Sequence, residues 1–264
     1  MRRALARMRG AWERRERTWG EPRSPNGASS FHLVWEVPQT PLDEVAATLE
    51  ILVPPVVDRL YFWALQVSFA SNRRLQGGAH LGLQWNPKFP GKTAVNWGGY
   101  GTGGGGTRIL KGTPSRLPSA RGDRNTRDFG WGFGRRYRLR VAPSPDLPSE
   151  GFAWRGTVTD LESGEETTVR DLYAGGSHLM SPMVWTEAFA RCEQPSVTVR
   201  WSDLSAVGED GEDLRPQRVR INYQSRSDGG CDNTTAAVDE LGLLQITSVQ
   251  RQVPQGAILP VPGN

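Results

Sequence analysis

The stretch SFHLVWEV, residues 30–37, alternates strictly between the two sides of an extended chain. One side carries Phe31, Leu33, Trp35 and Val37, and the other carries His32, Val34 and Glu36. In a β-strand, successive side chains point to opposite faces, so this pattern is typical of a strand with one face buried. Residues 30–37 therefore predict a β-strand on the surface of a hydrophobic core.

Runs of the same kind follow along the chain, separated by Gly, Pro, Asn and Asp. They are ATLEILV (47–53), RLYFWALQVSFA (59–70), GAHLGLQWN (78–86), TAVNWGGY (93–100), RRYRLRVA (135–142), FAWRGTVTDL (152–161), EETTVRDLY (165–173), SPMVWTEAFA (181–190), PSVTVRWSDLSAV (195–207), RVRINYQ (218–224) and LLQITSVQR (243–251). The run 47–53 could also be a short helix, although Pro54 and Pro55 directly after it favour a strand. The pattern predicts an all-β fold, a two-sheet antiparallel β-sandwich of the jelly-roll type.

Two hairpins and one long loop are also expected. The sequence PKFPGK (87–92) separates two of the runs, and Glu162, Ser163 and Gly164 separate two others. Such short connections are typical of antiparallel neighbours. By contrast, residues 111–135 show no periodicity, and loops of this length are often functional or mobile.

The length and composition of the chain indicate how it is divided into domains. The chain has 264 residues with 10 Trp, 31 Gly and 19 Pro, which suits a large aromatic core and many tight turns. We expect a disordered basic arm over residues 1–28 and a single sandwich domain over residues 29–264.

The net charge of +4 is carried by the arm, because residues 1–23 hold eight Arg and three Glu and leave a body that is close to neutral. A nucleic-acid-binding domain would carry its basic face on the folded part, so nucleic acid is not an expected partner. We found neither a secretory signal nor an apolar run long enough to span a bilayer, so no membrane association is expected and the predicted location is cytoplasmic.

Cys192 and Cys231 are the only two cysteines. In a reducing cytoplasm the expectation is two free thiols, and export of the protein would favour a disulfide instead. Two cysteines alone cannot complete a four-ligand zinc site, and the three histidines are far apart in the sequence. No metal and no cofactor are therefore predicted.

Several short motifs do not carry function. Gly91-Lys92-Thr93 lacks the earlier glycine and the following helix of a phosphate-binding loop, and Arg121-Gly122-Asp123 is a common tripeptide in a loop. No GxSxG nucleophile motif and no run of alternating carboxylates for a glycosidase occur. The glycines of residues 98–106 predict a flexible edge or a close approach of backbones.

The candidate binding residues come from residues 78–100. His80 and Gln84 share one strand face, and Asn96 on the next strand faces the same way if the two strands pair. Aromatic planes with directional amide and imidazole groups are suited to sugars. The full predicted site comprises His80, Gln84, Asn96, Trp97 and Tyr100, bordered by Trp131 from the long loop. Alternatively, these polar groups hydrogen-bond one another or face solvent.

The chain resembles concanavalin-A-like lectin/glucanase sandwiches. The features that carry this resemblance are the succession of Trp-rich strands, the segments AHLGLQWN and AVNWGGY, and the glycine-rich loop. More narrowly, the chain resembles a family of bacterial proteins without an assigned activity. Five segments carry this resemblance: LYFWALQVSF, GGAHLGLQWNP, AVNWGGY, WRGTVTDLESGEE and VRWSDL. The resemblance implies a sandwich fold and transfers no catalytic residue. Polysaccharide lyases of related fold place His, Gln and Tyr on a concave sheet, where His80, Gln84 and Tyr100 could take the corresponding roles.

These observations favour a non-catalytic, lectin-like protein that binds carbohydrate on a concave sheet face. Two alternatives remain open at this stage. One is a carbohydrate-active enzyme, either a polysaccharide lyase or a glycoside hydrolase, and the other is a structural or protein-interaction domain.

Overall fold

The computed structural model describes residues 16–38, 40–72, 74–102, 108–119, 121–146 and 151–263. Most of the predicted basic arm lies outside these residues. Apart from one short 3-10 turn, the regular secondary structure of the described residues is all strand. The strands are β1 (Ser29–Trp35), β2 (Leu42–Val53), β3 (Tyr61–Ser71), β4 (Arg74–Trp85), β5 (Thr93–Gly101), β6 (Arg108–Ile109), β7 (Thr126–Asp128), β8 (Arg136–Pro143), β9 (Phe152–Asp160), β10 (Glu166–Ala174), β11 (His178–Ala188), β12 (Thr198–Gly208), β13 (Asp213–Leu214), β14 (Arg218–Tyr223), β15 (Thr234–Asp239), β16 (Gly242–Thr247) and β17 (Ile258–Pro260).

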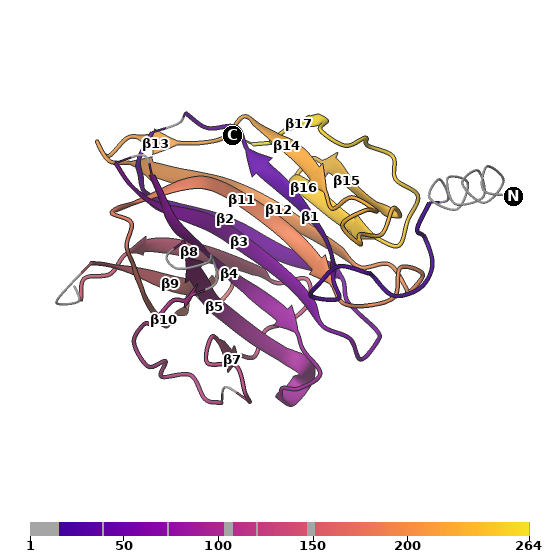
Figure 1. Ribbon diagram of the computed structural model, residues 1–264, viewed down its shortest axis with the longest axis horizontal. Helices are drawn as coiled ribbons and strands as arrows, with labels where there is room; N and C mark the ends of the chain where they lie inside the picture. The colour runs from indigo at the N-terminus through magenta and orange to yellow at the C-terminus, as the bar shows by residue number, and fades with distance from the viewer. Residues whose placement is uncertain are drawn as a thin grey trace, which may run out of the picture.

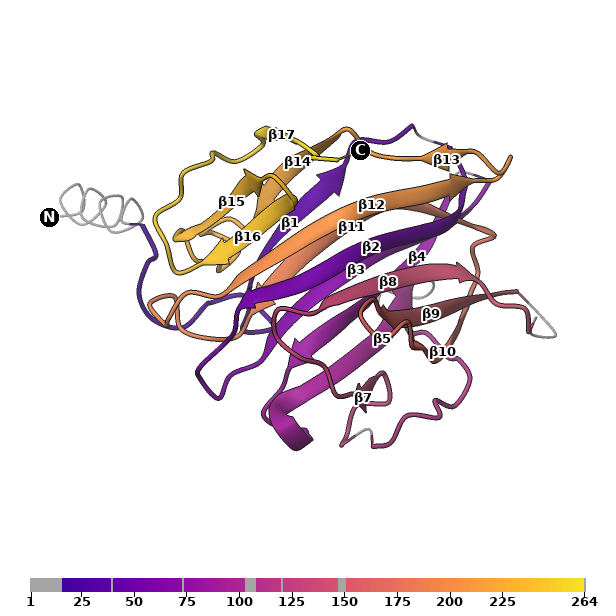
Figure 2. The same cartoon turned by 180° about the vertical axis from the view of Figure 1, so that it is seen from behind.

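The strands form two antiparallel layers that pack face to face (Figures 1 and 2). The layer facing the reader in Figure 1, called sheet A here, has the order β17–β14–β1–β11–β3–β4–β5, with the short strands β6 and β7 on the edge of β5. The layer facing the reader in Figure 2, called sheet B, has the order β15–β16–β12–β2–β8–β9–β10, with β13 on β12. The predicted two-sheet antiparallel β-sandwich is confirmed.

The core between the sheets follows from side-chain alternation. In β1 the burial pattern is strictly alternating, with Phe31, Leu33 and Trp35 buried as the sequence predicts. The largest fully buried side chains are aromatic, among them Trp63, Trp97, Trp154 and Trp201. Tryptophan therefore fills the space between the sheets, and the core is indole-rich.

Two of these indoles also satisfy their polar groups across the core. Trp97 on β5 donates its Nε1–H to the carbonyl oxygen of Trp154 at 3.3 Å, and Trp154 on β9 donates to the carbonyl oxygen of Gly176 at 3.1 Å. Gly156 lies directly beneath the Trp97 ring, where an added Cβ would come within 2.8 Å of the indole. A side chain is excluded at this position because an indole occupies its space.

The predicted hairpins are present, and some strands were not expected. Pro90–Lys92 forms a 3-10 turn between β4 and β5, and β9 and β10 flank the predicted turn at residues 162–164. The strand β2 begins at Leu42, earlier than expected, and is not a helix. Among the strands that the sequence reasoning missed, β15 has the sequence TTAAVD, which is too small and polar to show a clear alternation.

The expectation of two free thiols is wrong. Cys192 and Cys231 form a disulfide, with a Cα–Cα distance of 5.7 Å. The pairing could not be derived from the sequence, because it depends on the end of β11 lying beside the loop before β15. No helix among the described residues is long and apolar enough to cross a bilayer.

The Trp97–Gly156 contact can be tested by Gly156→Ala. The added methyl group overlaps a ring that is enclosed on all sides, so we expect a loss of about 1–3 kcal/mol in the free energy of unfolding, measured by urea denaturation. Gly130→Ala is the matched control, because nothing lies within 4 Å of its added Cβ. Equal stability of the two variants would contradict this account of the core.

The disulfide can be tested by the double variant Cys192→Ser, Cys231→Ser. The cysteines are 39 residues apart, and closing a loop of that length stabilises the fold by about 4 kcal/mol in the chain-entropy model. We expect the double variant and the reduced wild-type protein to unfold at similarly low denaturant concentrations. An oxidised wild-type protein that unfolds together with them would show that the bond does not form.

Candidate functional site

The outer face of sheet A differs in chemistry from the outer face of sheet B. On sheet B, Arg200 pairs with Glu50 at 2.7 Å and with Asp239 at 2.7 Å, and Arg140 pairs with Glu44 at 2.6 Å. Such a network of ion pairs is an ordinary solvated surface. On β1, β11, β3, β4 and β5 the outer face of sheet A instead carries aromatic, imidazole and amide side chains, whereas Arg218 and Arg220 on β14 pair with Glu36. The aromatic part of this face is the candidate site.

An aromatic cluster forms the floor of this face. Phe62 on β3 and Trp185 on β11 meet edge to face with ring centroids 4.9 Å apart, and both are only 5% exposed. His80 on β4 lies edge-on to both rings, at 5.5 Å and 5.7 Å. Trp185 donates its Nε1–H to Oε1 of Gln66 at 3.0 Å, which fixes that amide. The floor is therefore rigid and apolar, with polar groups at defined positions.

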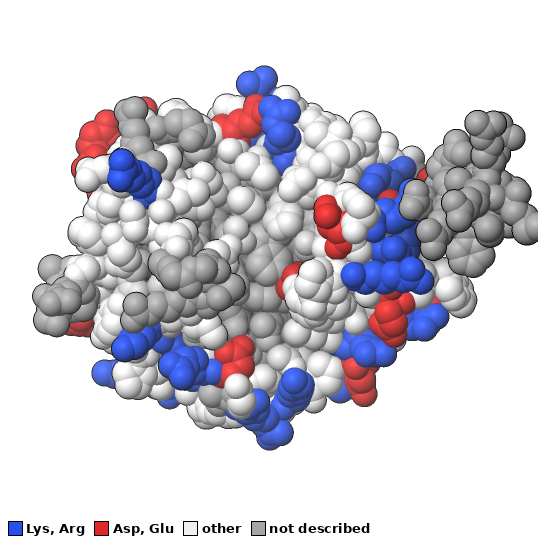
Figure 3. Space-filling model, viewed as in Figure 1, with Lys and Arg blue, Asp and Glu red and all other residues white. Residues whose placement is uncertain are grey.

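The shape of the face agrees with this chemistry. Figure 3 shows sheet A from outside, with a hollow across the middle and with Lys, Arg, Asp and Glu gathered mainly toward the margins. The strands β1, β11, β3, β4 and β5 place one carboxyl on this face among their described residues, that of Glu187.

Glu187 stands in an unusual environment. It lies on β11 beside Phe62 of β3 and Ser30 of β1. Burial raises the pKa of its carboxyl above the ordinary glutamate value, and a hydrogen bond from Nδ2 of Asn26 at 2.8 Å opposes the shift. A carboxyl whose pKa is raised by burial is a recognised sign of acid–base function.

Gln84 lies in the same transverse row as Glu187. The register pairs Glu187 with Phe62 and Phe62 with Gln84, so the two polar residues are two strands apart, or roughly 10 Å by the usual strand spacing. Oε1 of Gln84 accepts a hydrogen bond from Asn86 at 2.9 Å, and within the described residues its Nε2 has no acceptor. A donor and a carboxyl thus flank the aromatic floor.

The sequence-predicted site is only partly brought together. His80, Gln84, Asn96 and Tyr100 do share the outer face of sheet A, as the alternation predicts. Gln84 and Asn96 are each only 5% exposed, and Asn96 donates to Thr126 at 2.8 Å. Tyr100 is well exposed near the edge of the sheet.

Trp97 and Trp131 do not belong to this face. Trp97 points into the core, because it directly follows Asn96 on β5 and successive side chains of a strand point to opposite faces. Trp131 also enters the core, where its Nε1–H lies 3.3 Å from the carbonyl oxygens of Gln84 and Ala94. Placing these two indoles at an open binding surface was wrong.

Sequence reasoning missed the aromatic floor and its carboxyl. Phe62, Gln66 and Trp185 lie on strands that are apolar on both faces, so their alternation gave no signal of an outer cluster. Asn26 is 161 residues from Glu187 in the sequence, and only the folded chain brings the two together.

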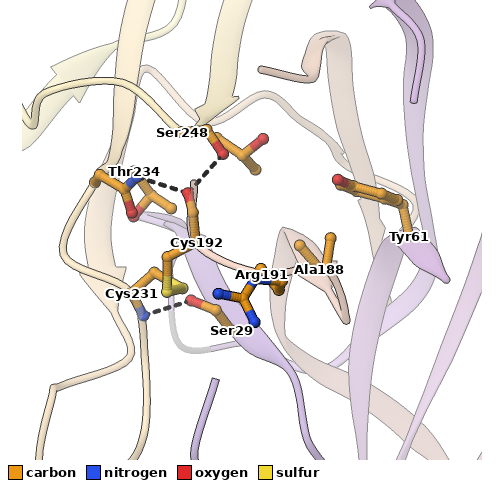
Figure 4. Close-up of a pocket in the computed structure, with 11 residues that line it drawn as sticks. Ser29, Tyr61, Ala188, Arg191, Cys192, Cys231, Thr234 and Ser248 are labelled. Carbon is orange, nitrogen blue, oxygen red and sulfur yellow. Dashed lines mark hydrogen bonds between the residues drawn. A yellow bond between two sulfur atoms is a disulfide. The ribbon is translucent and has the colours of Figure 1, made fainter. Parts of the chain in front are cut away.

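The disulfide region anchors the segment that carries Asn26. Figure 4 shows Cys192 and Cys231 beside Ser29, Thr234 and Ser248, around a cavity of about 10 Å³. The Cys231 amide donates to Oγ of Ser29 at 2.8 Å, and the Cys192 amide donates to the carbonyl oxygen of Gly20 at 2.9 Å. A volume of this size fits one water molecule, so this cavity is structural and is not a substrate site.

No family model and no curated protein matches the chain. Among solved structures, scytalido-glutamic peptidase with a peptide-based transition-state analogue is similar at 11% identity and a TM-score of 0.43, covering 87% of this chain and 98% of that one. The same peptidase with a transition-state analogue inhibitor is similar at 12% sequence identity and a TM-score of 0.43. SCP-B, an eqolisin peptidase in complex with the tripeptide Ala-Ile-His, is similar at 11% identity and a TM-score of 0.42. Both comparisons also cover 87% of this chain and 98% of the other. At these values the likeness identifies no functional residue in this chain.

The lectin-like function expected from the sequence is corrected by these findings. The similar solved structures are peptidases and not lectins. Of the amides expected to bind sugar hydroxyls, that of Asn96 is enclosed and donates its Nδ2 hydrogen to Thr126. A carbohydrate-binding role has no support in the fold.

The protonation of His80 gives a test of the geometry of the outer face. Burial lowers the pKa of His80 to about 4, and nearby Asp123 opposes that shift. The neutral imidazole is favoured in the folded state, so its contribution to stability is complete above pH 6.5 and is lost as the pH falls toward about 4. We expect His80→Asn to reduce the loss of stability over this range, measured by thermal denaturation.

Asp123→Asn provides the matched measurement on the same ring. Removing the carboxylate takes away the group that favours imidazolium, so the pKa of His80 should fall further in an NMR titration. A His80 ring that titrates near its ordinary value of 6.5 in the wild-type protein would contradict its enclosure by Phe62 and Trp185.

Proposed function

We propose that this protein hydrolyses polypeptide chains bound in extended form over the outer face of sheet A, with Glu187 as the general acid–base. The observation that carries this proposal is a carboxyl of raised pKa beside the aromatic floor, where the described residues of β1, β11, β3, β4 and β5 carry no other carboxyl. Amide hydrolysis needs a group that accepts a proton from water and returns it to the leaving amine, and a carboxyl near its pKa can do both.

The aromatic floor suits a peptide substrate. An extended peptide alternates its side chains, so those that face the sheet can rest on Phe62 and Trp185 while the backbone carbonyls lie between the polar groups. Glu187 would take a proton from water on one side of the scissile carbonyl. Nε2 of Gln84, on the other side, would donate a hydrogen bond to the carbonyl oxygen as its charge develops.

The surroundings of Glu187 serve this chemistry. Burial raises the pKa of the carboxyl, and the Asn26 amide donates a hydrogen bond to its Oε1. The similar solved structures bind a tripeptide and peptide-based analogues, as their names state. That likeness agrees with the proposal, although its support comes from the site itself.

Two features of the whole chain belong with this proposal. We infer that residues 29–264 make one domain of the concanavalin-A-like type, since strands from both halves of the chain alternate within each sheet. We also infer that the protein works in an oxidising compartment and not in the cytoplasm, because disulfides persist where thiols are not kept reduced.

The test is proteolysis of reduced, alkylated casein followed by mass spectrometry between pH 3 and pH 8. We expect cleavage that grows as the pH rises through the raised pKa of Glu187, since the base must be ionised. Glu187→Gln should lower the rate by about 100-fold or more, which is the usual contribution of a general base.

Glu44→Gln is the matched control. It makes the same chemical change on the outer face of sheet B, where Glu44 pairs with Arg140, and it should leave the rate unaltered. Absence of cleavage by the wild-type protein at every pH, or equal rates for the two variants, would overturn the proposal.

A further inference from the structure

A second pocket lies away from the outer face of sheet A, beside the edge strand β10 of sheet B. It has a volume of about 370 Å³, which is within the range of small-ligand sites. Its lining includes three arginines, two aspartates and the hydroxyls of two threonines. These residues are Arg116, Arg155, Arg170, Asp146, Asp171, Thr113 and Thr168.

Arg155 and the two aspartates neutralise one another. Arg155 donates to both carboxylate oxygens of Asp171, at 2.8 Å and 3.0 Å, and to Asp146 at 2.9 Å. The Asp171 side chain is only 3% exposed. This wall of the pocket is therefore a closed ion-pair network with its carboxylates already engaged.

Arg170 is the opposite case, because it is buried and forms no ion pair with any residue that the structure describes. It is only 4% exposed, and its Nη1 donates to the carbonyl oxygen of Arg124 and to Oδ1 of Asn125, both at 3.1 Å. Within the described residues its Nε has no hydrogen-bond acceptor, and its Nη2 donates to none. Burying a guanidinium away from water without a counter-ion destabilises the fold unless another group compensates for its charge.

The neighbours of Arg170 increase the need for an anion. Burial, and after it the charges of Arg127 and Arg124, lower the pKa of Arg170, and Asp123 opposes them only in part. Arg116, on the pocket wall, is exposed and makes no ion pair with any described residue. Arg116 and Arg170 both line this pocket, and no carboxylate of the described residues pairs with either.

We propose that this pocket binds a phosphate or sulfate group between Arg116 and Arg170. Guanidinium groups bind tetrahedral oxyanions through paired N–H donors, and the hydroxyls of Thr113 and Thr168 add donors on the same wall. Thr113 already accepts a hydrogen bond from the Asp171 amide at 2.9 Å, which leaves its hydroxyl proton for the ligand. The site is independent of Glu187 and of the proposed hydrolysis.

The test is thermal denaturation of the full chain during titration with inorganic phosphate and, separately, sulfate, with sodium chloride adjusted to constant ionic strength. A ligand that binds the folded state raises the melting temperature with the logarithm of its concentration once above its Kd. We expect saturable binding of both anions by isothermal titration calorimetry, with Arg116→Gln weakening it about tenfold or more.

Arg121→Gln is the matched control, since Arg121 is an exposed arginine of the same loop and does not line the pocket. It should bind both anions as the wild-type protein does. Arg170→Gln should abolish binding of both anions. If that variant does not fold, the affinities of Arg116→Gln and Arg121→Gln for the anions are compared instead to test the proposal. Stabilisation that chloride reproduces at equal ionic strength, or equal affinities for the Arg116 and Arg121 variants, would overturn the proposal.

Discussion

The packing of indole rings against backbone between the two sheets is the constraint on which the rest of the structure depends. Trp97 extends from sheet A to the carbonyl of Trp154 on sheet B, and its ring occupies the space above Gly156. Trp154 continues the chain of contacts to Gly176. An indole fixes both distance and orientation, because its apolar body must be enclosed while its N–H finds an acceptor. These contacts close the sandwich on the side of β5, β9 and β10.

The same packing decides what the outer face of sheet A can offer. Once Trp97 points inward, Asn96 must point outward, and once Trp63 and Leu65 fill the core, Phe62 and Gln66 lie outside. The outer face of sheet B carries ion pairs, whereas the outer face of sheet A carries a second, smaller aromatic cluster.

Alternation was enough to predict the fold class, most strands and the common face of His80, Gln84 and Asn96. It could not reveal what lies above a strand that is apolar on both sides, so Phe62 and Trp185 passed as ordinary core residues. Nor does it describe contacts made by irregular chain. The long loop returns Trp131 to the core, and the Cys192–Cys231 bond depends on two segments that only the folded chain brings together. Tertiary packing, rather than local pattern, determined each of these features.

The loop of residues 123–126 interacts with residues of both proposed sites. On one side, Arg170 donates hydrogen bonds to the carbonyl oxygen of Arg124 and to Oδ1 of Asn125. On the other, Asp123 accepts from Thr126 at 2.6 Å and acts on His80 of the aromatic floor. The side chain of Asn125 also lies against Gly98 of β5 so closely that a Cβ there would come within 2.7 Å. Arg170 and His80 therefore both depend on this short loop, the first through hydrogen bonds and the second through the charge of Asp123.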